Sequence, residues 1–140
     1  MKTICLRFSD AYAPEKGTIQ SHQEIINQNG FVWYGKKGAK ISKEVLEDLL
    51  KNGPVEIVLI KSGSDERYLA TLIDFDYKKK SECPDYYKDY LFDMSTWLKI
   101  TSIKKTDSDI LDHCFVISSG LPINSIIKKS MGSYFIVEYR

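Results

Sequence analysis

Two features that mark common classes of protein are missing from this sequence: long apolar runs and an excess of one charge. No apolar run exceeds about six residues, whereas about 20 are needed to cross a bilayer. The 20 Lys and Arg residues nearly balance the 19 Asp and Glu residues, which leaves a net charge of +1 over 140 residues. Proteins that coat nucleic acid without regard to sequence need a large positive excess. The sequence therefore predicts no membrane span, and any contact with nucleic acid must come from a local site.

Residues that build disulfide frameworks and metal sites are also scarce. The three cysteines, Cys5, Cys83 and Cys114, are an odd number without CxxC spacing, and there are only two histidines. These numbers argue against a disulfide-stapled secreted domain and against a zinc site. No P-loop, GxGxxG or HExxH motif is present, and the N-terminus lacks the apolar core of a signal peptide. We therefore expect a cytoplasmic protein with no metal or other cofactor.

The order of apolar runs and turn residues predicts an α+β fold. Strands in the middle of the chain follow one another without a helix between them, which argues against a doubly wound parallel sheet. We expect a curved mixed sheet, or a partly closed β-barrel, of about six strands with about three flanking helices. The predicted strands cover residues 3–8, 31–34, 55–60, 67–77, 96–103 and 133–139, with a further apolar run at 115–117. The predicted helices cover 18–29, the segment between Ser42 and Gly53, and 121–127.

Aromatic residues make up 12% of the chain, and two groups of them lie in polar surroundings. Trp33 and Tyr34 precede a Gly- and Lys-rich segment at 35–38, and further aromatics follow three lysines in a polar segment at 78–94. Connections as long as this one are often functional. Aromatic rings stack on nucleobases at about 1–3 kcal/mol per base, and lysines hold the flanking phosphates. The structural alternative is that Trp33 anchors the core and that the tyrosines pack the long loop onto the sheet.

The order of several short motifs resembles the PUA-like superfamily, in particular its YTH and EVE branches. The resemblance covers most of the chain, and we expect residues 1–140 to be one such domain, of the kind found at the N-terminus of longer proteins. Its motifs are Arg7-Phe8-Ser9-Asp10, the strand at 30–35 with its Trp, the hairpin at 54–76, the strand with a second Trp at 92–100, and Ser118 to Pro122. In YTH domains further cage tryptophans lie in the loop before the fifth strand, where this chain has only Tyr and Phe.

The resemblance implies a reader of a modified, above all methylated, base in DNA or RNA, which is flipped out of its stack into an aromatic pocket. Related domains are specificity modules of modification-dependent restriction systems, with a fused or associated nuclease or NTPase effector. Trp33 would be one stacking wall, and Trp97 would lie in the pocket floor or the core. The facing wall would be Tyr86, Tyr87 or Tyr90, and the base edge would be read by Ser9, Asp10 and Tyr34. The lysines expected to contact phosphates are Lys36, Lys37, Lys40, Lys78, Lys79 and Lys80.

Two other functions remain open from the sequence. A small enzyme on a PUA-like or ASCH-like scaffold could act on a nucleoside or RNA, with Asp10, His22, Lys61 or Asp74 as its acid or base. The aromatic loop could instead bind another protein. A convergent pair of titratable groups in the pocket would favour an enzyme, whereas an aromatic cleft without one would favour binding. We expect the domain itself to be non-catalytic.

Overall fold

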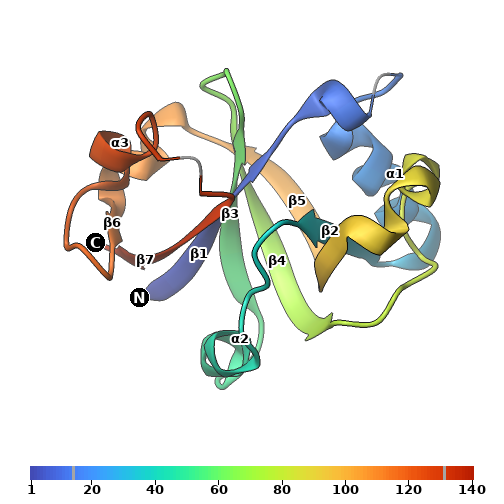
Figure 1. Ribbon diagram of the computed structural model, residues 1–140, viewed down its shortest axis with the longest axis horizontal. Coiled ribbons are helices and arrows are strands. Elements are labelled where there is room, and N and C mark those ends of the chain that lie inside the picture. The colour runs from blue at the N-terminus through green and yellow to red at the C-terminus, as the bar shows by residue number, and fades with distance from the viewer. Residues whose placement is uncertain (14, 131) are drawn as a thin grey trace.

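A computed structural model describes residues 1–13, 15–130 and 132–140, and its seven strands form one mixed sheet (Figure 1). The strands lie in the order β2-β5-β4-β3-β1-β7-β6, so β2 and β6 are the two edges and the sheet is open rather than closed. β1 pairs in parallel with β3, and the other neighbours are antiparallel. The strands are β1 (Lys2–Phe8), β2 (Val32–Lys37), β3 (Val55–Lys61), β4 (Arg67–Asp76), β5 (Met94–Thr106), β6 (Cys114–Val116) and β7 (Tyr134–Tyr139).

The helices are short and flank the sheet. They are α1 (Thr18–Asn29), α2 (Lys43–Leu50) and α3 (Ile123–Ile126), with 3-10 turns η1 (Asp10–Tyr12), η2 (Asp85–Asp89), η3 (Leu91–Asp93) and η4 (Ser108–His113). Gly30 ends α1 in the left-handed conformation, with φ 84°, as its position after the predicted helix indicated. The hydroxyl of Ser42 caps α2 by accepting from Val45 N–H. No helix in the described part of the chain is long and apolar enough to cross a membrane.

The core consists of two layers, one on each face of the central strands. Side chains alternate along a strand, so Ile57 and Leu59 of β3 join one cluster while Val58 and Ile60 join the other. The first cluster is covered by α1 and α2, and the second by α3 and η4. Because β1 and β3 are buried on both faces, they hold the sheet rigid under the loops that follow them.

The mixed α+β architecture agrees with the sequence prediction, but the strand count and two strand lengths do not. The apolar run at 115–117 forms the seventh strand, because it pairs with β7 at the edge of the sheet. β2 continues through residues 35–37, beyond the strand predicted at 31–34. β5 extends to Thr106, because it pairs with β2 over residues 94–100 and with β4 over residues 97–106.

Candidate functional site

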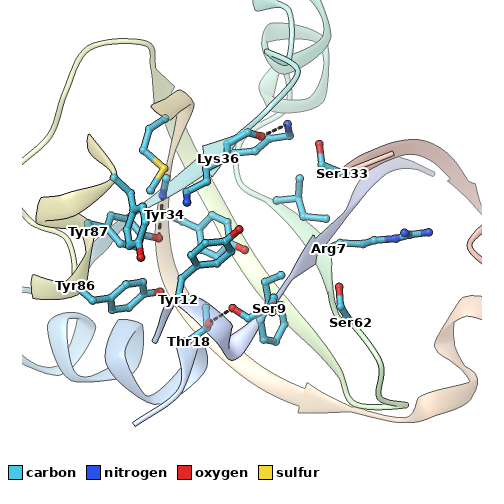
Figure 2. Close-up of a pocket in the computed structure, with 16 residues that line it drawn as sticks. Arg7, Ser9, Tyr12, Thr18, Tyr34, Lys36, Ser62, Tyr86, Tyr87 and Ser133 are labelled. Atoms are coloured by element: carbon cyan, nitrogen blue, oxygen red, sulfur yellow. Dashed lines mark hydrogen bonds between the residues drawn. The ribbon is translucent and has the colours of Figure 1, made fainter. Parts of the chain in front are cut away.

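A cavity of about 250 Å³ opens beside the C-terminal end of β1, next to β2 and the start of α1 (Figure 2). Five tyrosines line it, and three cationic side chains and several small polar groups complete it. Figure 2 shows the labelled tyrosines gathered on one side, with Arg7 extending away from them on the other. None of the described lining residues is a carboxylate or a histidine. The lining includes Tyr12, Tyr34, Tyr86, Tyr87, Tyr90, Ser9, Thr18, Met94, Arg7, Lys36 and Lys37.

The edge strand β2 contributes two consecutive lysines to this lining, and a β-bulge interrupts its pairing with β5 beside them. In a regular strand, neighbouring side chains point to opposite faces of the sheet. The pairing of β2 with β5 shifts between Lys36, opposite Thr96, and Lys37, opposite Met94. The extra residue of this bulge, Ser95, lies on β5, and both Lys36 and Lys37 border the cavity. The edge strand therefore presents Tyr34 and two adjacent cations to one site.

Tyr87 is held in the cavity wall by a hydrogen-bonded chain. Its hydroxyl accepts from the Gly35 N–H at 3.1 Å and lies 2.6 Å from Nε2 of His22. Nδ1 of His22 lies 2.7 Å from the Thr18 carbonyl oxygen, which can only accept. Nδ1 therefore carries the proton, and Nε2 accepts from the Tyr87 hydroxyl. Burial lowers the pKa of His22 to about 4, so the ring is neutral and fixes the tyrosine as a donor.

Two further groups at the cavity have perturbed protonation. Burial raises the pKa of Tyr34 above its usual value, so its hydroxyl stays protonated. Burial lowers the pKa of Lys36 to about 8. The Lys36 ammonium donates to the carbonyl oxygens of Lys37, at 2.9 Å, and Ala39, and it lies 4.8 Å from the ring centroid of Tyr134. No carboxylate in the described residues lies within ion-pair distance of it, so a cation is held here by neutral groups alone.

A family model described as Pua-like matches residues 4–132. The chain belongs to the Pua-like family. The PUA-like part of the resemblance is thereby confirmed, and domains of this kind bind nucleic acids. No curated protein and no solved structure gives a significant match to the chain.

Most of the predicted base-binding residues of this Pua-like domain meet at the cavity. Tyr34 comes from β2, Ser9 follows β1, and the three tyrosines come from η2 and the residue after it. The Ser9 hydroxyl accepts from Ala11 N–H at 3.2 Å, and this bond holds the turn that carries Tyr12. The predicted residues that line the cavity are Ser9, Tyr34, Tyr86, Tyr87 and Tyr90.

Asp10 is close to the cavity but serves the neighbouring structure. One carboxylate oxygen accepts from Thr18 N–H at the start of α1, at 2.9 Å, and the other lies 3.3 Å from the Lys61 ammonium. Burial opposes the charge of Asp10, but these two partners outweigh it and lower its pKa. Lys61 also pairs with Glu66 at 3.0 Å, and its pKa is raised. The pair is therefore a fully ionised structural bridge outside the cavity.

The two tryptophans, Trp33 (predicted as a stacking wall) and Trp97 (predicted in the pocket floor or the core), do not line this cavity. Trp33 neighbours Tyr34 in a regular part of β2, so its side chain points to the opposite face. Trp33 is only 7% exposed and Trp97 1%, and they pack with Tyr87 in a separate cluster. Tyr87 belongs both to the cavity lining and to the tryptophan cluster, because it borders the cavity and its ring centroid lies 6.0 Å from that of Trp97. The tryptophans therefore support the wall from behind.

Only two of the six predicted phosphate-binding lysines, Lys36 and Lys37, line the cavity. The Lys40 ammonium lies 4.0 Å from the ring centroid of Tyr77, and Lys79 lies 5.9 Å from that of Phe92. Lys80 pairs with Asp76 at 2.6 Å and covers Trp33, while Lys78 is exposed. The lysine cluster at 78–80 therefore flanks the tryptophan cluster instead of the cavity.

Several residues that line the cavity were not predicted from the sequence. Tyr12 is the most informative, since it is an aromatic residue 45% exposed in the turn directly after β1. Such a residue beside the predicted Ser9 could have been found from its place at the end of a strand. Arg7, Ser62 and Ser133 come together because the sheet brings β1, the end of β3 and the start of β7 side by side. Thr18 comes from α1 and Met94 from β5.

Proposed function

We propose that this domain is a non-catalytic reader of a methylated base in DNA or RNA, which it holds flipped out in the tyrosine-lined cavity. The observation that carries the proposal is the composition of the cavity. Five tyrosines and two lysines converge there from β2, η1 and η2, and none of its described lining residues is a carboxylate or a histidine. Flat π-faces with adjacent cations suit a heterocycle on a phosphate backbone.

The size of the cavity supports a single base as the ligand. A cavity of about 150 Å³ holds a benzene ring, and the volume here is about 250 Å³. A pyrimidine or purine with one added methyl group is larger than benzene, as this larger cavity requires. Tyrosine rings supply apolar area for the methyl group, and the hydroxyls of Tyr12, Tyr34 and Ser9 supply hydrogen-bond partners for the base edge.

The protonation states favour binding over catalysis. The neutral ring of His22 is fully buried behind Tyr87, and Lys61 is held by Asp10 and Glu66. Asp74 is exposed on β4, and within the described residues its carboxylate accepts a hydrogen bond only from its neighbour, Phe75 N–H. The acids and bases named from the sequence, Asp10, His22, Lys61 and Asp74, thus lie outside the cavity lining. Any chemistry belongs to a fused or associated nuclease or NTPase effector, as in modification-dependent restriction systems.

Fluorescence-anisotropy titrations with matched oligonucleotides test this function. The oligonucleotides carry N6-methyladenine, 5-methylcytosine or no methyl group, each as DNA and as RNA. We expect one methylated probe to bind more tightly than its unmethylated partner. Tyr12→Ala should lower the affinity for that probe by about 5- to 150-fold, the range expected for the loss of one stacking contact. Tyr139→Ala is the control, because Tyr139 lies on β7 and does not line the cavity. Equal affinity for all probes, unchanged by Tyr12→Ala, would refute the proposal.

A further inference from the structure

The ammonium of Lys37 sits between two tyrosine rings of the cavity. Its Nζ lies 3.7 Å from the ring centroid of Tyr12 and 3.8 Å from that of Tyr90. The two rings are 5.3 Å apart and nearly perpendicular, at 79°. Cation–π contacts are counted out to about 6 Å, so this cation is close to both rings. No ion pair of Lys37 with an acidic residue is found in residues 1–13, 15–130 and 132–140.

Three separate segments are needed to build this arrangement. Tyr12 is the last residue of η1, Tyr90 follows η2, and Lys37 ends β2 after the bulge. Lys36, its neighbour in β2, lies over the ring of Tyr134 instead. The end of β2 therefore places one lysine between two rings that otherwise offer stacking surface to the cavity.

We propose that Lys37 closes the cavity in the free protein and moves to a backbone phosphate when a flipped nucleotide enters. This inference rests on the proposed function. A base stacked on Tyr12 or Tyr90 needs the space that the ammonium occupies, so entry requires Lys37 to leave. Its flexible four-carbon stem permits that movement, and the half-buried side chain already borders solvent.

The exchange makes Lys37 a residue that distinguishes a strand from a free nucleoside. A nucleoside must displace the ammonium from the rings and offers no negative charge in return. A nucleotide within a strand has phosphates on both sides, and a phosphate contact is a strong charge-assisted interaction for the displaced lysine. Lys37 thus weakens the binding of a free nucleoside and strengthens the binding of a nucleotide within a strand. Free methylated nucleosides would then compete poorly with the modified strand.

The test compares Lys37→Met with the wild-type domain on two ligands. Methionine keeps the length and the apolar character of the stem but removes the charge. The probes are free N6-methyladenosine and 5-methylcytidine, and oligonucleotides that carry the same bases. We expect the nucleoside bound by the wild type to bind about 2- to 5-fold more tightly to Lys37→Met, the equivalent of one released cation–π contact. The oligonucleotide should bind more weakly, and its slope of log affinity against log salt should fall by about one.

Lys40→Met is the matched control, because Lys40 lies three residues further on, over the ring of Tyr77 and outside the cavity. It should leave nucleoside binding unchanged. Parallel weakening of both ligands by Lys37→Met would overturn the inference, as would an unchanged nucleoside affinity, while base selectivity in the wild type would still support the reader. A wild-type protein that prefers no methylated probe refutes the reader itself and the inference with it. Thermal melting of each variant checks that the fold is retained.

Discussion

The hydroxyl of Tyr87 lies 2.6 Å from Nε2 of His22, and the histidine ring is completely buried. This bond joins the long connection between β4 and β5 to helix α1, 65 residues away in sequence. It also fixes the position of a tyrosine that borders the cavity on one side and packs on Trp97 on the other. The wall of the site is thus preorganised by a buried polar contact, and its geometry leads to the first two predictions.

Tyr87→Phe should destabilise the domain without changing its compactness. The substitution leaves Nε2 of His22 without a donor and the Gly35 N–H without its acceptor. An unsatisfied buried polar group costs about 1–3 kcal/mol. Urea unfolding should show that loss of free energy with an unchanged m-value. Tyr90→Phe is the control in the same loop, since no hydrogen bond of the Tyr90 hydroxyl is found in the described residues. Equal effects of both variants would contradict the role of the His22 contact.

The free energy of unfolding should decrease as the pH is lowered, over a range set by the pKa of His22. Its pKa is about 4 in the folded state, below the usual value of 6.5, because burial disfavours the charged ring. As the pH falls, the unfolded chain takes up this proton before the folded chain does. The contribution of His22 to the free energy of unfolding is therefore full above pH 6.5 and is lost as the pH falls towards 4. The shift corresponds to about 3 kcal/mol.

His22→Gln should remove this pH dependence, because glutamine does not titrate. The variant will be less stable overall, so the readout is the slope of unfolding free energy between pH 7 and 5 and not its absolute value. Carboxylates with lowered pKa, such as Glu66 at about 2, contribute at lower pH and do not affect that slope. His113→Gln is the control on an exposed histidine. An unchanged slope in His22→Gln would show that another group titrates.

Substitutions at Trp33 and Tyr12 should have different effects, the first on stability and the second on binding. Trp33→Phe removes part of a buried side chain from the cluster with Tyr87 and Trp97, so the unfolding free energy should fall by about 1–3 kcal/mol. The folded fraction should still bind the methylated oligonucleotide. Tyr12→Ala, at a half-exposed position, should keep its stability within about 1 kcal/mol but lose binding. If Trp33→Phe abolished binding in a folded protein, Trp33 would belong to the site after all.

The contrast between these two residues shows what the sequence could and could not predict. Strand patterns located β1, β3 and β4, and the polar aromatic loop pointed to the tyrosines of η2. The sequence also placed Trp33 and Tyr34 at the right strand, but alternation puts only one of two neighbours on a given face. Which face borders a cavity depends on where η1 and η2 cross the sheet. That is a long-range relationship, and no local pattern encodes it.

The lysines show the same limit for charge. Lys36 and Lys37 were found because they lie in the aromatic strand, whereas Lys78, Lys79 and Lys80 were grouped with the tyrosines that follow them in sequence. In the structure, Asp76 and Trp33 hold Lys80 away from the cavity. The contacts of Lys37 with Tyr12 and Tyr90 join three segments that are separate in the sequence. Proximity along the chain therefore predicted the residue types that form the site, but not which individual lysines line it.

Binding of the methylated oligonucleotide should weaken as the pH rises through about 8. The pKa of Lys36 is lowered to about 8 by burial, so the residue loses its charge there while ordinary lysines keep theirs. The change in affinity between pH 7 and 9 therefore reports on Lys36. Lys36→Arg should hold its charge throughout and bind with a flat pH profile. Lys36→Met should also be flat, but weaker at every pH. A wild-type profile that matches Lys36→Arg between pH 7 and 9 would exclude Lys36 from the electrostatics of the site.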